Sequence, residues 1–197
     1  MQCWVALDRA VKLAPDLGLD DRIEAWATER DCIREAVLGR GWSDEQQAFT
    51  QSFDAPELDA AALLMPLVGF LPATDPRMRS TIEAIARDLT DDGLVLRYRS
   101  AAGPNTDGLA GAEGTFVICS FWLVSCLAQA GELERAEALF ARLDGYANDL
   151  GLLAEEVDPV TGELLGNFPQ AFSHVGLIVA ARDLDAAQGR DSGRDPA

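Results

Sequence analysis

Several common signals are missing from this chain of 197 residues. No apolar run reaches the roughly 18 residues that span a bilayer. The start, Met1 to Val5, shows no basic segment followed by an apolar one. We therefore expect no membrane span and no signal peptide. The four cysteines form no CxxC pair and no metal motif occurs, so we expect no metal and no cofactor. Free thiols suit a reducing compartment, which predicts a cytoplasmic location.

Basic residues are also scarce. The sequence has 16 Lys and Arg against 33 Asp and Glu, for a formal net charge of −17. Such a surface repels phosphate backbones and anionic lipid headgroups, so we expect neither nucleic acid nor a membrane as partner. The remaining composition, with 48% hydrophobic and 25% charged residues, is that of a globular protein, and the length suits one domain.

Strand signals are weak, and helical periodicity dominates the chain. Pro66 should kink or shorten the third of the helical stretches. Asp75-Pro76 supplies an N-cap followed by proline at the first helical position of the fourth. The sequence thus predicts an all-α protein of about seven helices. The expected helices span residues 1–14, 20–38, 57–70, 75–89, 113–129, 132–147 and 169–185.

The connections between these helices alternate in length. Short links (15–18, 71–74 and 130–131) are followed in turn by long ones (40–55, 91–112 and 148–168). Because short links make neighbouring helices antiparallel, the long loops should gather at one end, where loops often carry function. This favours a partial arc of an (α/α) toroid with a pocket at one end. A helical-repeat solenoid is the alternative, but no recurring motif supports it.

The domain boundary is expected near the C-terminus. Residues 188–197 are rich in Gly, Asp, Arg and Pro, a composition typical of a disordered tail. This leaves residues 1–187 as the folded domain.

The first two long loops contain candidate binding residues. Trp42 offers a stacking surface, although aromatic residues in this loop also serve to pin it to the core. Arg97 and Tyr98 end a short extended stretch, just before the fifth helix. Glu113 stands at the start of that helix, where a carboxylate also complements the helix dipole.

The third long loop contains adjacent carboxylates, Glu155 and Glu156, between apolar residues. In an extended segment neighbouring side chains point in opposite directions, so one can face a pocket while the other anchors the loop. The alternative is that both are solvated, as charge pairs in loops usually are, although the apolar flanks draw this segment inward. The lone His174 lies on the apolar seventh helix, and no Ser or Cys is spaced to form a triad with it. We interpret it as a satisfied histidine of the core or pocket rim.

Three segments carry a family resemblance. They are EGTFVICSFWLV (113–124), GLLAEEVDP (151–159) and LGNFPQAFSH (165–174). They resemble the C-terminal part of the catalytic domain of glycoside hydrolase family 15, which contains glucoamylases, glucodextranases and bacterial-type trehalases. CWVALDRA (3–10) and ELDAAALLMPLVGFLP (57–72) are similar to the bacterial branch. The resemblance reaches about Asp185 and implies an (α/α)6 barrel.

The resemblance also implies a reaction and its residues. The family inverts the anomeric centre with two carboxylic acids, set apart to leave room for a water. Glu155 matches the position of the general base. Glu156 falls where some members have Gln, which favours a substrate-binding role. Arg97 and Tyr98 resemble the pair that contacts the non-reducing sugar, and Glu113 lies at the pocket mouth. The implied substrate is an α-glucoside, either a maltooligosaccharide or trehalose.

The general acid of the family lies upstream of the segment that resembles residues 3–9. The sequence therefore suggests a fragment that is inactive alone, with the other half of the barrel as its partner. Two alternatives remain. One is a helical interaction module that self-associates through its first helix. The other is a carbohydrate-binding remnant without catalysis.

Overall fold

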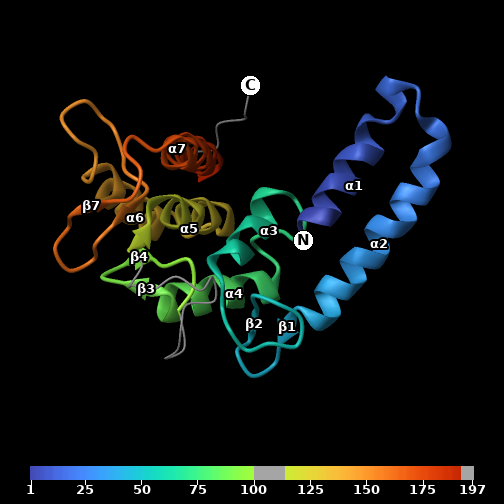
Figure 1. The fold of residues 1–197 in the computed structure, drawn as a ribbon, viewed down its shortest axis with the longest axis horizontal. Coiled ribbons are helices and arrows are strands. Elements are labelled where there is room, and N and C mark those ends of the chain that lie inside the picture. The colour runs from blue at the N-terminus through green and yellow to red at the C-terminus, as the bar shows by residue number, and fades with distance from the viewer. Residues whose placement is uncertain (100–113, 192–197) are drawn as a thin grey trace.

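The computed structural model describes residues 1–99 and 114–191, with side chains described to residue 189. Seven α-helices lie within this part of the chain, joined by two-residue strands and short 3-10 turns (Figure 1). The helices are α1 (Gln2–Leu13), α2 (Ile23–Arg40), α3 (Leu64–Leu67), α4 (Pro76–Asp88), α5 (Val117–Ala130), α6 (Leu133–Asp144) and α7 (Ala171–Asp191). The strands are β1 (Trp42–Ser43), β2 (Ala48–Phe49), β3 (Thr90–Asp91), β4 (Leu94–Val95), β5 (Thr115–Phe116), β6 (Glu156–Val157) and β7 (Leu164–Leu165).

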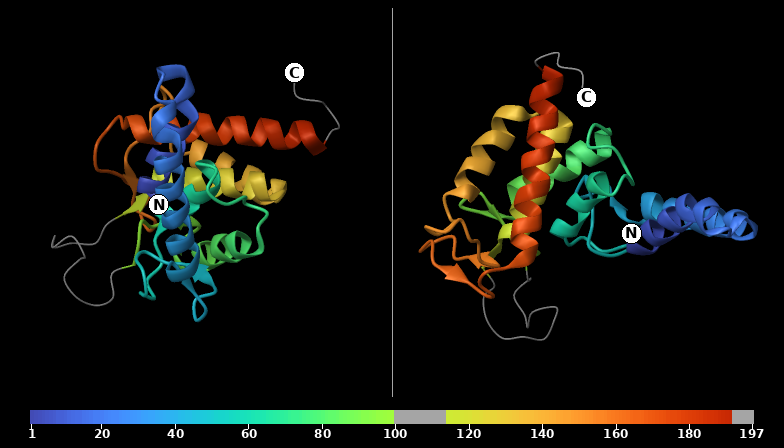
Figure 2. Two further views of the ribbon diagram at one scale, coloured as in Figure 1. Left: turned by 90° about the vertical axis from the view of Figure 1, so that its right-hand side faces the viewer. Right: turned by 90° about the horizontal axis from the view of Figure 1, so that it is seen from above.

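The helices form a body and a projecting hairpin. α5 lies at the centre of the body, packed against α6 and α7 and also against α3 and α4. α1 and α2 run side by side, and they point away from the body in Figure 1 and in the right-hand view of Figure 2. Within the described part of the chain, no helix is both long and apolar enough to cross a bilayer.

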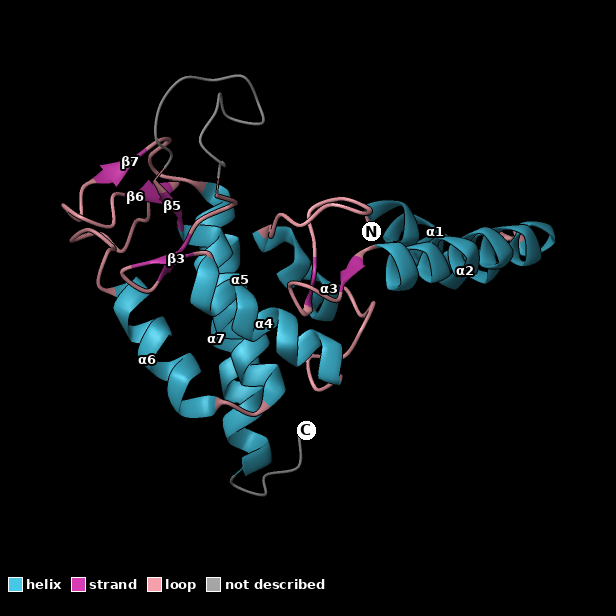
Figure 3. Ribbon diagram, turned by 90° about the horizontal axis from the view of Figure 1, so that it is seen from below, coloured by secondary structure: helices cyan, strands magenta, loops and turns pink. Residues whose placement is uncertain are grey.

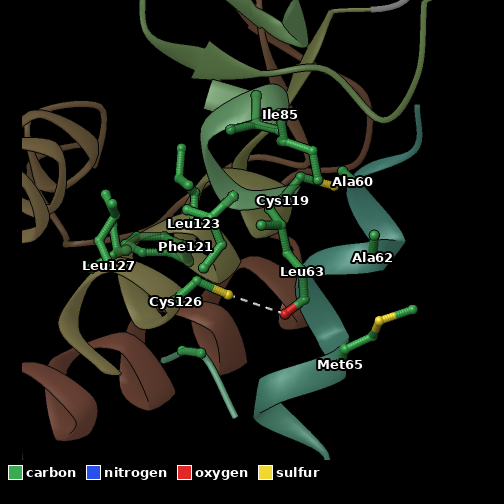
Figure 4. Packing of buried hydrophobic residues seen from close by; sticks show 14 of the residues in the cluster. Ala60, Ala62, Leu63, Met65, Ile85, Cys119, Phe121, Leu123, Cys126 and Leu127 are labelled. Carbon is green, nitrogen blue, oxygen red and sulfur yellow. Dashed lines mark hydrogen bonds between the residues drawn. The ribbon is translucent and has the colours of Figure 1, made fainter. Parts of the chain in front are cut away.

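The core is built around α5, because this helix is apolar on nearly all sides and must be covered on every face. Phe121 is fully buried and Leu123 and Leu127 nearly so. The thiol of Cys126, also buried, donates to the carbonyl oxygen of Leu63 at 3.2 Å (Figure 4). Burial raises the pKa of this thiol, and the charge of Asp183 adds to the effect. Cys126 therefore behaves as a neutral packing residue.

Several expected helix limits are wrong, most clearly those of the third, fifth and seventh helices. The third helix is short, with a 3-10 turn (Ala60–Leu63) and α3, which ends just after Pro66. The fifth begins at Val117 instead of 113. Thr115 and Phe116 are extended as β5, and the Thr115 hydroxyl donates to the Val157 carbonyl oxygen at 2.8 Å. The pairing with β6 therefore competes with helix formation there.

The seventh helix is longer than expected. α7 continues to Asp191, so residues 188–191 are helical although the sequence suggested a tail from 188. Gln188 explains part of this, because its side-chain amide donates to Glu137 Oε1 of α6 at 2.7 Å. Residues 192–197 lie outside the described part of the chain. The fourth helix agrees with expectation, since Asp75 accepts from the Arg77 amide as N-cap.

The second and third long loops meet, as the alternating connections predicted. The first does not join them, since it packs against α4, where the Thr81 hydroxyl accepts from the Phe49 amide at 3.0 Å. β5 and β6 join the second and third loops in one sheet, with β7 on the other edge of β6. Residues after the first loop reach the second, since Asp59 forms an isolated bridge with Tyr98 and the Ala60 amide donates to Arg97 O at 2.8 Å. Figure 3 shows β5, β6 and β7 together beyond the ends of the body helices.

Candidate active site

The third long loop is held between two helices. Glu155 immediately precedes β6, and its carbonyl oxygen accepts from the amide of Val117, the first residue of α5, at 3.0 Å. Its own amide donates to the Asn167 carbonyl oxygen, also at 3.0 Å. The backbone of Glu155 is thus fixed on one side to α5 and on the other to the chain that enters α7.

The two adjacent carboxylates have different surroundings. Oε2 of Glu156 accepts from the Gly114 amide at 2.8 Å and so holds the chain that leads into β5. Oε2 of Glu155 accepts from both the backbone amide and the side-chain Nδ2 of Asn167, at 3.0 and 2.7 Å. Gly166 gives room for this, because a Cβ there would lie 2.9 Å from the same oxygen. One carboxylate therefore anchors the loop and the other lies along a cavity.

This cavity has a volume of about 310 Å³ and is largely apolar. Three of its residues are polar: Glu155, Gln170 and Ser173. Its other residues are Phe116, Ile118, Trp122 and Phe172. A half-buried carboxylate beside aromatic rings suits a small ligand that is apolar on one face and carries hydroxyl groups on its edge, as a sugar ring does.

Arg97 packs against Phe116, which lines the same cavity, and Tyr98 packs against Arg97. The Arg97 guanidinium carbon is 5.3 Å from the centroid of the Phe116 ring and 4.7 Å from that of Tyr98. Its Nη2 donates to the Tyr98 hydroxyl at 2.9 Å. Phe116 thus connects the cation to the wall of the cavity that Glu155 lines, and the structure brings these three predicted site residues into one region.

Two other predicted residues are not in this group. Trp42 lines a different cavity, of about 380 Å³, within the first long loop. Its Nε1 donates to Asp44 at 2.9 Å, and its ring packs edge-on against the buried Phe49 at 5.3 Å between centroids. Glu113 lies outside the described residues. Within residues 1–99 and 114–191, no group of three or more His, Cys, Asp or Glu residues is placed to hold a metal ion.

Sequence reasoning missed some of the residues around Glu155. Asn167 supplies two donors to its carboxylate, and Gln170 lines its cavity. The segment 165–170, which carries part of the family resemblance, contains both residues and is the signal that could have found them. Trp122, in contrast, lies on the helix that the family resemblance implies along the pocket, and it lines this cavity.

Comparison with known proteins decides the family. A family model described as "Glycosyl hydrolases family 15" matches residues 1–182. The chain belongs to this family. A trehalase of Mycolicibacterium smegmatis is 52% identical over 180 residues, which are 91% of this chain and 26% of the relative. A trehalase of Thermoplasma volcanium is 39% identical over 185 residues, 93% of this chain and 29% of the relative.

Solved structures of glycosidases confirm the fold. A glycosidase variant in complex with glucose matches with a TM-score of 0.71 at 23% identity, over 89% of this chain and 48% of the other. The wild-type glycosidase matches with a TM-score of 0.69. The all-α toroid of the (α/α)6 type is therefore correct. This family 15 chain spans about half of those solved chains, and between a quarter and a third of the trehalases it matches.

Proposed function

We propose that this chain contributes the general-base side of a site that hydrolyses an α-glucosidic bond with inversion. Glu155 is the base. One observation carries the proposal: the Glu155 carboxylate is fixed by two Asn167 donors through Oε2 at the wall of an aromatic cavity. Among the described residues nothing donates to Oε1, so this oxygen is available to accept a proton from water. The catalytic water then attacks the anomeric carbon from the face opposite the departing sugar.

Arg97 and Tyr98 are the proposed sugar-binding residues, because they lie behind Phe116 at the same cavity. Glu113, which lies outside the described residues, is proposed to bind substrate as well. Glu156 acts in this proposal by fixing Gly114, and therefore indirectly. Trp42 belongs to a separate cavity and is a candidate only for a distal sugar unit.

Trehalose is the proposed substrate, and the trehalase relatives at 52% and 39% identity support this choice. A maltooligosaccharide is the other α-glucoside that fits the same chemistry. Inversion also needs a carboxylic acid on the other side of the bond, roughly 6.5–9.5 Å from the base. We propose that this acid is provided by a part of the barrel outside these 197 residues, as is the opposite wall of the pocket. The chain alone should then release little or no glucose.

The test uses the 197-residue chain and a chimera. In the chimera, the matching 180 residues of the Mycolicibacterium smegmatis trehalase are replaced by those of this chain. Glucose release is measured from trehalose and from maltooligosaccharides. In the active form, Glu155→Gln should lower kcat by about 10²–10⁴-fold, the usual contribution of a general base. Glu156→Gln is the matched control, with a smaller loss.

Undiminished release in Glu155→Gln would remove Glu155 from the role of base. Release by the unmodified 197-residue chain, lost on Glu155→Gln, would show that a carboxylic acid within the chain serves as the acid. Sugar binding by the chimera without turnover would favour a carbohydrate-binding protein over a hydrolase.

A second role, in association, has one specific observation behind it. Phe172, Val175 and Ile178 form an apolar stripe on α7, and each is more than half exposed. Exposed apolar surface of this kind favours a protein partner, here either the rest of a family 15 barrel or a second copy of the chain. The stripe lies on α7, whereas the sequence pointed to the first helix. Light scattering on the purified chain separates a monomer from a self-associated form.

A further inference from the structure

The residues before Glu155 are joined to the start of α7 by more than backbone pairing. The amide of Gln170 donates to Leu153 O at 2.9 Å, which is a backbone contact. Two side chains of α7 add to it. Ser173 Oγ donates to Ala154 O at 2.7 Å, and the ring of His174 accepts from the Leu153 amide at 3.3 Å. Consecutive residues of α7 thus hold consecutive residues of the loop.

The hydrogen-bond partners of His174 indicate which of its ring nitrogens carries a proton. Nδ1 lies 2.7 Å from the carbonyl oxygen of Gln170, and a carbonyl oxygen can only accept. Nε2 receives the Leu153 amide, and a backbone amide can only donate. The ring must therefore be neutral, with its single proton on Nδ1. A proton on Nε2 would face another donor and remove the bond to Leu153.

The Leu153 amide, which donates the hydrogen bond to His174, is shielded from water. Leu153 and Ala154 are each only 1% exposed, and so is Ser173. A buried amide that loses its acceptor bears the full cost of desolvation, so the segment would move to find another partner. Glu155 follows directly in sequence, and its place in the cavity depends on the path of these two residues.

We propose that His174 is a positioning residue for Glu155. It acts through the Leu153 amide, in the neutral Nδ1–H form, and it does not touch the reacting atoms. That Glu155 is the residue to be positioned for catalysis rests on the proposed function. The hydrogen-bonded connection from His174 through Leu153 to the Glu155 backbone is independent of the proposed function.

The chain has only one histidine, which permits a direct test on the full 197-residue protein. ¹⁵N NMR of a histidine-labelled sample near neutral pH should show one ring, protonated at Nδ1 and unprotonated at Nε2. Amide hydrogen exchange is then compared among wild type, His174→Leu and His174→Gln. His174→Leu removes both ring contacts, whereas the Gln side-chain oxygen can still accept from Leu153.

In His174→Leu the amides of Leu153, Glu155 and Asn167 should exchange at least about tenfold faster, as expected for a lost buried hydrogen bond. Amides in the middle of α4 should be unchanged, and His174→Gln should restore most of the protection. In the active chimera, His174→Leu should lower kcat more than it changes KM, again with rescue by Gln.

A ring protonated at Nε2, or unchanged exchange at Glu155 and Asn167 in His174→Leu, would overturn the proposal. If His174→Leu does not fold, the other two measurements decide. A proton on Nδ1 in wild type and near-wild-type amide exchange in His174→Gln support the proposal, and a proton on Nε2 overturns it. A failure of the proposed function looks different: Glu155→Gln would remain active while the exchange pattern stayed as expected.

Discussion

The body around α5 and the α1–α2 hairpin are both helical, but they are stabilised differently. Eleven residues of α5 are buried, whereas Val37 is the only buried residue of α2. At the tip of the hairpin Leu13 and Leu17 are more than half exposed. Helical periodicity therefore predicts the helix in both regions, and burial then depends on how many neighbours each helix has. In the hairpin, each helix packs chiefly against the other helix.

Few contacts join the hairpin to the body. The ring of Trp4 packs edge-on against Phe70, with 5.0 Å between centroids. Arg9 Nη2 donates to Val68 O at 2.8 Å, and Arg77 Nη1 donates to Leu38 O at 3.1 Å. Arg34 likewise donates to the carbonyl of Phe70. Most of these are side-chain bonds to backbone carbonyls, so we expect mutations here to cost less stability than mutations in the body.

The largest difference should appear on removing a buried side chain from α5. Phe121 is fully buried and lies 6.0 Å from the Phe140 ring of α6. Phe121→Ala should lower the free energy of unfolding by about 3–5 kcal/mol, because it removes apolar burial and leaves a cavity. Leu17→Ala, in the hairpin and 66% exposed, is the matched control and should change it by less than about 0.5 kcal/mol. Urea denaturation of both variants measures this, and equal losses would contradict the comparison.

Two glycines within helices test the same contrast at smaller scale. A Cβ on Gly176 of α7 would lie 3.1 Å from Phe121 Cβ and 3.4 Å from Ile118 Cγ1, whereas a Cβ on Gly39 of α2 would meet nothing within 4 Å. Gly176→Ala should destabilise by about 1–2 kcal/mol through crowding between α5 and α7. Gly39→Ala should stabilise by about 0.5–1 kcal/mol, the ordinary helix-propensity gain. Thermal unfolding of the two variants shows whether each is more or less stable than wild type. A stabilising Gly176→Ala would show that α5 and α7 are loosely packed at this position.

The sequence predicted the helices well where their pattern was long, and less well where strands compete. The all-α toroid, the N-cap at Asp75 and the meeting of the second and third long loops followed from periodicity and link length, whereas the predicted meeting with the first loop was wrong. The start of α5 did not, because β5 forms only by pairing with β6, some 40 residues away in the chain. Such pairing is a tertiary contact that no local propensity reveals.

For the candidate site, the sequence pointed to two adjacent carboxylates but did not show how they are held. Alternation in an extended segment predicted that Glu155 and Glu156 diverge, and they do. It could not predict the donors of Asn167 or the contact from His174 to Leu153, because both depend on where α7 starts relative to the loop. Trp42 is a candidate by residue type alone. Its position in the sequence does not show that it lines another cavity.

A third effect, which shrinks as the pH falls, concerns a carboxylate in the hairpin. Asp8 is only 5% exposed, and it accepts from Arg9 and, at 2.9 Å, from Lys12. Burial alone would raise the pKa of Asp8, but the hydrogen bonds and charges of Lys12 and Arg9 outweigh it and hold this pKa below the ordinary value of 3.8. A lowered pKa in the folded state means that ionised Asp8 stabilises the fold above pH 3.8, and that this contribution is lost as the pH falls through the folded-state pKa.

Asp8→Asn keeps the shape and removes the charge. It should lower the free energy of unfolding by about 1 kcal/mol at pH 7, since its partners are largely exposed. The difference from wild type should shrink as the pH is lowered below about 4. Denaturant midpoints of both proteins between pH 7 and pH 3 measure this. Because Arg9 also bonds Val68, a loss much larger than expected would mean that Asp8 orients Arg9 and that the hairpin is joined to the body through this pair. A loss that does not vary with pH would mean that the charge of Asp8 contributes nothing to the fold.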